Sequence, residues 1–360
     1  MDVTEAARIA EPEVLIGWVV RDAPWMATTQ LPVRTFLTGQ GTRAAVDAGT
    51  VSTFPARLSA IPGLLSGRMK PEVLVVGVHE SSAGFTLAHS PGFVGTAMGQ
   101  ARSVVVERWQ GDPIPGAPVV SAEVVAVFER EDPPDPPPRN EPTSVHHGIG
   151  ELVASLIPEG ATVQWGPGVI GSSVIASLRR PVQVRSGLVT DELVSLEEAG
   201  LLQGTAEAAY MWGGPALRGM LEDGRLRLCG IEHTHDLTAI SAVESFVAIN
   251  TALQVGLDGA ANVETVNGRI VSGAGGHPDF AAGASRSPGG LSIVALPSTA
   301  GDRSTIVPAP ERISTPRADV DVVVTEHGIA DLRGLDDRAR AERMIEVAAP
   351  EHRDWLGEHT

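Results

Sequence analysis

Apolar, β-branched runs alternate with amphipathic stretches along most of the chain. Short β-branched runs predict strands over residues 72–78, 103–107 and 123–128. Further on, the pattern predicts a helix over 144–156, a strand over 162–165, a helix over 172–178 and a strand over 181–185. A strand, a helix and a second strand at this spacing form a parallel pair. The sequence therefore predicts an α/β fold of two similar domains with mainly parallel sheets.

Prolines crowd residues 129–143, which can form neither the interior of a helix nor a central strand. We interpret this segment as an extended linker. It divides the chain into an N-terminal α/β domain, residues 1–128, and a C-terminal α/β domain, residues 144–360.

The amino-acid composition limits the kinds of molecule that the protein is expected to bind. The chain has 360 residues, 42% of them hydrophobic, and a formal net charge of -17. Such a charge argues against a general nucleic-acid or anionic-membrane surface, because those surfaces depend on clustered Lys and Arg. Lys70 is the only lysine, so the positive charge is nearly all arginine, which suits bidentate phosphate recognition in a local pocket.

Cysteine usage and the N-terminus bear on the compartment. The single Cys229 excludes an intrachain disulfide, and the first residues lack the pattern of a signal peptide. No run approaches the roughly 20 apolar residues that span a bilayer. We expect a cytoplasmic protein in which Cys229 is a small buried hydrophobic residue rather than a nucleophile.

Two glycine clusters are candidates for backbone recognition of a ligand. Residues 166–171, Gly-Pro-Gly-Val-Ile-Gly, follow a predicted strand, so their N–H groups could hold an anion; a plain tight turn is the alternative. The spacing does not match the dinucleotide fingerprint. Residues 273–276, Gly-Ala-Gly-Gly, could bring N–H groups to a developing oxyanion, or could form a hairpin turn.

Several ordered blocks in the C-terminal half carry a resemblance. They are Asn-Thr-Ala-Leu-Gln-Val at 250–255, Gly-Ala-Gly-Gly-His-Pro-Asp-Phe at 273–280, Pro-Ser-Thr at 297–299, Ile-Val-Pro at 306–308, Val-Thr-Glu-His-Gly-Ile-Ala-Asp-Leu-Arg-Gly at 324–334, and Ala-Ala-Pro-Glu-His-Arg at 348–353. In kind and order they resemble the acetyl-CoA hydrolase and 4-hydroxybutyrate CoA-transferase family, which is a class I CoA-transferase family. The N-terminal half matches more faintly.

The resemblance implies two related halves with the active site at their interface, and an acyl-CoA substrate without a prosthetic group. We expect a homodimer or larger homo-oligomer. The resemblance implies that these residues contact the CoA thioester: Gly166, Gly168, Val169, Ile170, Asn250, Gly273, Gly275 and Gly276.

The same resemblance shows that two family carboxylates are missing. The family attacks the thioester with a glutamate, and Gly187 stands at the matching position, while Gln254 replaces a second family glutamate. Glycine has no nucleophile for covalent catalysis. Asp191 and Glu192, just downstream, are not expected to replace it, because Asp191 has its own family counterpart.

Other polar residues are the candidates for chemistry. His277, Glu80 and His79 are the tentative catalytic residues, each able to act as acid or base near a substrate. His277 could instead be a hydrogen-bonded structural residue. His233 and His235 alternate on a possible strand end, so that one could point outward; without a third ligand at diagnostic spacing we expect no metal.

The sequence leaves three hypotheses about function. The favoured one is an enzyme that binds an acyl-CoA or related thioester and acts by hydrolysis or proton transfer, without a glutamyl-CoA intermediate. The second is a CoA-transferase that uses another carboxylate, with Glu80, Glu232 and Glu264 as candidates. The third is a non-catalytic CoA-binding or scaffold protein.

Overall fold

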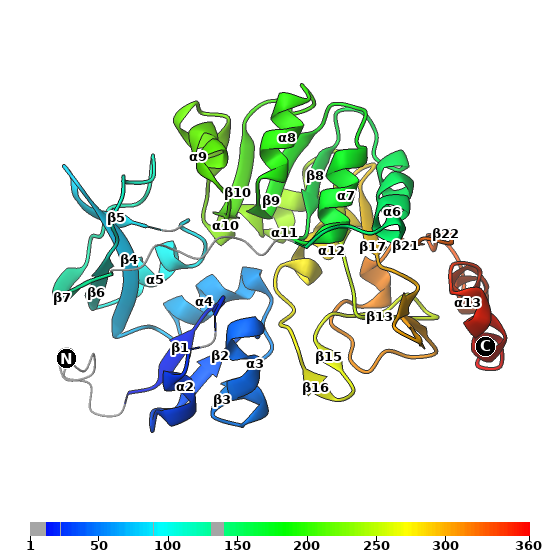
Figure 1. Ribbon diagram of the computed structural model, residues 1–360, viewed down its shortest axis with the longest axis horizontal. Helices are drawn as coiled ribbons and strands as arrows, with labels where there is room; N and C mark the ends of the chain where they lie inside the picture. The colour runs from blue at the N-terminus through cyan, green and yellow to red at the C-terminus, as the bar shows by residue number, and fades with distance from the viewer. Residues whose placement is uncertain (1–11, 22, 89, 131–139) are drawn as a thin grey trace.

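An eight-stranded sheet forms the centre of the C-terminal half of this computed structural model (Figure 1), which describes residues 12–21, 23–88, 90–130 and 140–360. The strands lie in the order β11-β10-β9-β8-β12-β17-β21-β22, and all neighbours are parallel except the last pair. Their bounds are β8 Thr162–Trp165, β9 Gln183–Val189, β10 Ala206–Met211, β11 Leu226–Leu228, β12 Phe246–Asn250, β17 Leu291–Ala295, β21 Val322–Thr325 and β22 Gly328–Asp331.

The chain changes direction across this sheet between β8 and β12. From β8 it adds β9, β10 and β11 on one side, and it then returns to add β12, β17, β21 and β22 on the other. In open parallel sheets, ligands bind outside the carboxyl ends of the strands at such a reversal. The topology therefore marks the ends of β8 and β12 as the first place to look for a site.

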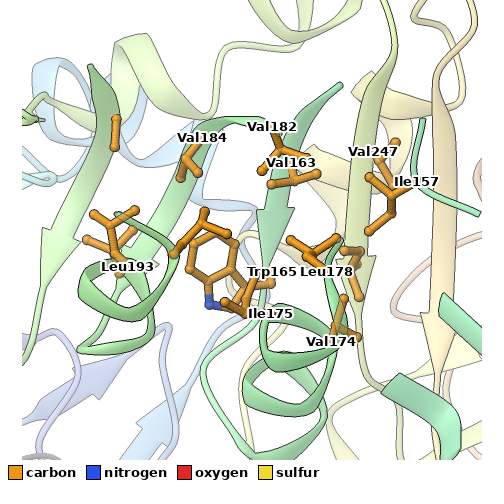
Figure 2. Close-up of a cluster of buried hydrophobic side chains, with 14 of the residues drawn as sticks. Ile157, Val163, Trp165, Val174, Ile175, Leu178, Val182, Val184, Leu193 and Val247 are labelled. Atoms are coloured by element: carbon orange, nitrogen blue, oxygen red, sulfur yellow. The ribbon is translucent and has the colours of Figure 1, made fainter. Parts of the chain in front are cut away.

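Helices cover both faces, so the central strands are buried throughout. One face carries α6 Ser144–Ser155, α7 Val169–Ser177, α8 Glu192–Glu198 and α9 Pro215–Glu222 (Figure 1). Trp165, Val184 and Leu193 belong to the core beneath them (Figure 2). Every residue of β8 and β12 is buried, as expected for strands covered on two faces.

The opposite face is covered by short helices that reach the candidate site. Packing joins α11 Leu237–Ser241 and α12 His277–Ala284 to β12 through Ile240, Phe246 and Phe280. Because α12 leads into the parallel strand β17, it runs opposite to the strands and begins at their carboxyl edge. Between α11 and β17 the chain also forms β13 Gln254–Gly256, β14 Ala261–Asn262, β15 Thr265–Val266 and β16 Arg269–Ile270.

Two smaller sheets make up the N-terminal half (Figure 1). A parallel sheet contains β1 Val14–Ile16, β2 Val33–Thr35 and β3 Val51–Thr53, and a second sheet, in the order β5-β4-β6-β7, contains β4 Val73–Ser81, β5 Gly84–Leu87, β6 Ser103–Arg108 and β7 Glu123–Glu129. Their helical elements are α2 Trp25–Thr28, α3 Gln40–Asp47, η1 Leu58–Ala60, α4 Ile61–Ser66 and α5 Val94–Gln100.

The remaining elements are α10 Ile231–Thr234, β18 Thr299–Ala300, β19 Arg303–Ser304, β20 Ile306–Val307, η2 Arg317–Asp319, α13 Asp337–Glu346, η3 Pro350–His352 and α14 Arg353–Gly357. None of the described helices is long and apolar enough to cross a membrane.

The predicted α/β class with mainly parallel sheets is confirmed, including the parallel pairing of β8 with β9. Strand β9 begins at Gln183 and extends to Val189, beyond the predicted end at residue 185. Gly187 therefore lies within the strand. Of the predicted linker, residues 131–139 fall outside the described part of the chain.

Candidate functional site at the carboxyl edge of the central sheet

The first glycine cluster forms a turn between β8 and α7 at the carboxyl edge. The N–H of Gly166 donates to the carbonyl of Ile249 on β12, at 3.0 Å. Gly168 has φ 136°, a conformation that favours glycine, and it is the residue before the first turn of α7. The predicted turn is present, and it leads directly into a helix N-terminus.

Asn250 ends β12 beside this turn. Its side-chain amide pairs with that of Gln164 on β8, with N–O separations of 3.3 and 3.4 Å, and both residues are buried. This reciprocal pair joins the two strands where the chain reverses direction. Asn250 is thus held at the position that the topology favours for a ligand.

Gly187 lies on β9, next to β8. The hydroxyl of the preceding residue, Ser186, lies 3.3 Å from the carbonyl oxygen of Trp165 on β8 and 3.1 Å from that of Leu188. A β-carbon on residue 187 would stand 3.2 Å from Nε2 of His235 and 3.3 Å from the ring of Phe280. Both distances are tighter than usual for a β-carbon. A side chain at position 187 would therefore point into space that an imidazole and a phenyl ring already occupy.

The second glycine cluster leads into α12 rather than forming a hairpin. A β-carbon on Gly273 would stand 2.7 Å from the carbonyl oxygen of Phe36, and the N–H of Leu58 donates to the carbonyl of Gly275. The N-terminal half thus packs on this loop. No described residue accepts a hydrogen bond from the N–H groups of Gly276 or His277.

Asp279, in the first turn of α12, fastens the two halves together. Its carboxylate accepts hydrogen bonds from the hydroxyl and the N–H of Ser59, at 2.5 and 3.0 Å. Burial raises the pKa of Asp279, against the opposing effect of these hydrogen bonds. In the sequence, Asp279 stands out only as part of the motif at 273–280. Its contact with Ser59, 220 residues away, leaves no pattern near either residue from which it could be predicted.

Two buried imidazoles lie near this loop, and some of their ring nitrogens have no hydrogen-bond partner among the described residues. Among the described residues, neither ring nitrogen of His277 has a hydrogen-bond partner, and Nε2 of His235 has none. Burial lowers the pKa of His277 to about 4 and that of His235 to about 3. Both rings are therefore neutral at pH 7, and the interpretation of His277 as a hydrogen-bonded structural residue is not supported.

The two tentative candidates from the N-terminal half lie elsewhere. His79 and Glu80 are on β4, in the smaller four-stranded sheet (Figure 1). Nδ1 of His79 lies 3.2 Å from the carbonyl oxygen of Trp109, and burial lowers the pKa of His79. Glu80 is exposed and pairs with Arg108 at 2.7 Å. No described contact joins either residue to Gly187 or α12.

The other carboxylates and Gln254 are also placed by the structure. The carbonyl oxygen of the Gln254 side chain accepts hydrogen bonds from Asn262 and from the N–H of Glu311, so this amide fastens strands together. Glu264 accepts a hydrogen bond from Ser314 at 2.7 Å and lines a cavity of about 30 Å³ together with Ser272, Gly273 and Ala274. Glu232 borders a separate cleft of about 330 Å³.

His233 belongs to an ion-pair network rather than to a strand end, because residues 231–234 form the short helix α10. Glu207 accepts hydrogen bonds from Arg185 and Arg227, and it lies 2.9 Å from Nε2 of His233. Burial opposes ionisation of Glu207, but these partners outweigh it and lower its pKa to about 2.

Cys229 lies close enough to Glu207 and His233 for the three to be considered as metal ligands. Two guanidinium groups already neutralise that carboxylate, which disfavours a cation there. Burial raises the pKa of the Cys229 thiol, in keeping with the predicted inert, buried cysteine.

Comparison with known proteins identifies the chain's relatives. Residues 219–360 match the family described as Acetyl-CoA hydrolase/transferase C-terminal domain. The chain is 30% identical over 352 residues to the succinyl-CoA:cyclohexane-1-carboxylate CoA transferase of Geobacter metallireducens, covering 91% of this chain and 80% of that protein.

It is also 29% identical over 346 residues to the 4-hydroxybutyrate coenzyme A transferase of Clostridium kluyveri, covering 88% and 79% of the two chains. The crystal structure of RipA from Yersinia pestis superposes with a TM-score of 0.81 at 27% identity, covering 91% of this chain and 80% of that one. The chain belongs to the acetyl-CoA hydrolase/transferase family.

Proposed function

We propose that the protein binds an acyl-CoA or related thioester at the carboxyl edge of the central sheet and acts on it without a glutamyl-CoA intermediate. Gly187 carries this proposal. It stands where the resemblance implies the family glutamate, it has no nucleophile, and His235 and Phe280 fill the space beside it. Hydrolysis or proton transfer is the chemistry that remains open to such a site.

The surroundings support thioester binding. The Gly166 turn and Asn250 flank the reversal between β8 and β12, where open α/β sheets bind ligands. Arginines near the second glycine cluster could meet CoA phosphates despite the overall negative charge. Arg43 donates to the carbonyl of Val271, and Arg312 lines the small cavity with Gly273.

The chemistry can be written for hydrolysis. Water attacks the thioester carbon and loses a proton to a neutral imidazole, for which His277 is our candidate. The oxyanion that forms accepts hydrogen bonds from N–H groups at the start of α12. The carbon–sulfur bond then breaks, and the thiolate takes the proton back, giving a carboxylic acid and free CoA.

A second function has one specific observation in its favour. Glu264 is nearly buried and lines the same small cavity as Gly273 and Ala274, so it is the best-placed alternative carboxylate for a CoA-transferase. Its hydroxyl partner Ser314 and the nearby Arg312 would have to release it before it could attack.

Incubation with a panel of acyl-CoAs distinguishes these two functions. Mass spectrometry of the intact protein detects a covalent adduct, and analysis of the small molecules detects free CoA or exchanged hydrogen. We expect release of free CoA, or exchange of substrate hydrogen with deuterated solvent, with no adduct on the protein. A hydroxylamine-sensitive adduct lost in Glu264→Gln would establish the transferase. CoA binding without any turnover across the panel would establish a binding protein.

Variants then assign the base. His277→Ala should abolish turnover while the protein remains folded. His147→Ala is the matched control, because His147 is exposed on α6. Equal rates in the two variants would remove His277 from the mechanism. Glu80→Gln and His79→Gln test the two candidates on β4 in the same assay.

A further inference from the structure

His235 is the most deeply buried imidazole beside the glycine positions of the candidate site. It follows the last residue of α10 and is fully buried. Its Nδ1 lies 2.9 Å from the hydroxyl oxygen of Thr234, and its ring centroid lies 4.7 Å from that of Phe280. These contacts fix the ring and leave only Nε2 without a described partner.

Two residues that have no side chain border Nε2. It lies 3.2 Å from the point where a β-carbon of residue 187 would stand and 2.6 Å from the corresponding point of residue 276. A side chain at Gly276 could not coexist with the ring in this position. Gly187 and Gly276 are both partly exposed, so the nitrogen lies directly behind exposed backbone.

An unpartnered buried polar group is destabilising, and a leucine or phenylalanine would fill the same space without that penalty. The N–H groups of Gly276 and His277, at the start of the eight-residue helix α12, also have no acceptor among the described residues. Nε2 of His235 lies beside Gly276, so it and these two N–H groups belong to adjacent parts of the site, and all three lack described partners. Together they suit a small polar group of a ligand.

We propose that His235 is a catalytic residue whose Nε2–H donates a hydrogen bond to the carbonyl oxygen of the bound thioester, between Gly187 and Gly276. This role rests on the proposed function and deepens it. The Thr234 hydroxyl has one hydrogen and two acceptors within reach, the carbonyl oxygen of Gly230 at 3.4 Å and Nδ1 of His235 at 2.9 Å. Donation along the shorter contact, to Nδ1, puts the ring hydrogen on Nε2, as the role requires.

The environment suits a neutral donor. Burial keeps the imidazole uncharged across the physiological range. A neutral imidazole can polarise a carbonyl, and its hydrogen bond strengthens as water attacks and charge develops on the oxygen. To reach Nε2, the carbonyl oxygen must enter between the Gly187 and Gly276 backbones. The ring of Phe280 borders the same place, 3.3 and 3.2 Å from the β-carbon positions of the two glycines.

The test uses the full chain and a ketone analogue of acetyl-CoA, in which a methylene group replaces the thioester sulfur and the carbonyl carbon is ¹³C. Binding is measured by calorimetry and polarisation of the carbonyl by its ¹³C chemical shift. The variants are His235→Leu and His235→Gln, with His277→Gln for comparison. Gln keeps an N–H near the position of Nε2, so it also covers the case in which the Leu variant fails to fold.

In the wild-type protein we expect a downfield carbonyl shift, which His235→Leu loses and His235→Gln keeps in part. With a turned-over thioester, kcat should fall about 100-fold in the Leu variant with little change in KM, as for loss of one oxyanion donor. An analogue that binds with the same carbonyl shift in wild type and both variants overturns the role of His235 alone. An analogue that does not bind the wild type overturns the proposed function as well.

Discussion

Nε2 of His235 lies 3.2 Å from the place where a β-carbon of residue 187 would stand. The glycine and the histidine therefore depend on each other: the missing side chain makes room for the ring, and the ring fills the space that a side chain would enter. Restoring a larger residue at 187 is not a local change, because it must displace a fully buried imidazole.

A double-mutant cycle should detect this dependence. Gly187→Ala crowds His235 and Phe280, and overpacking of this kind costs about 1–3 kcal/mol of unfolding free energy. In a His235→Ala background the part of that destabilisation due to the imidazole should disappear, while the contact with Phe280 remains. Urea unfolding measures all four proteins, and a coupling free energy near zero would contradict the contact. Gly219→Ala is the control, since a β-carbon there meets nothing within 4 Å.

Stability should fall in mild acid because of the two buried imidazoles. Their pKa values are lowered from 6.5 to about 3 and about 4, so they stay neutral in the folded state while the unfolded chain takes up protons as the pH falls below 6.5. The stability associated with keeping the two rings neutral is complete above about pH 7. It is lost progressively as the pH falls toward the lowered pKa values of the folded state. Between pH 7 and pH 5 each should account for about 2 kcal/mol.

Unfolding by urea at the two pH values measures this loss. His235→Gln and His277→Gln should each remove about half of this loss of unfolding free energy between pH 7 and pH 5, because Gln does not titrate. A slope unchanged by either substitution would show that these histidines are not the buried titrating groups.

Gly168→Ala should weaken CoA binding. Gly168 has φ 136° at the start of α7, so an alanine there strains the turn that we propose contacts the ligand. Gly160→Ala is the matched control, because Gly160 also has a positive φ, of 76°, and open space around it, but lies in the turn before β8. Calorimetric titration with CoA should show a loss of affinity only for the Gly168 variant; equal affinities would place CoA elsewhere.

Ser59→Ala should loosen the contact between the two halves. It removes the 2.5 Å hydrogen bond to the buried carboxyl of Asp279, and leaving such a group partly unsatisfied costs about 1–3 kcal/mol. Ser155→Ala, which removes an exposed hydroxyl that bonds only within its own helix, should change the unfolding free energy by less than about 0.5 kcal/mol. Similar losses in both variants would argue against the contact.

The sequence by itself determined the fold class, the strand at 162–165, a helix over 144–156, which ends one residue earlier in the structure, and the family. These depend on local periodicity and on motifs that are contiguous in the chain. It also singled out Gly187 and both glycine clusters. Only the tertiary structure decided which of the candidate residues lie together. It separated His79 and Glu80 from the carboxyl edge, and it distinguished half-buried His233 from fully buried His235, which are two residues apart. The reason is physical: the contacts of His235 with residues 187 and 276 depend on how β9 and α12 pack, and such long-range packing leaves no local pattern in the sequence.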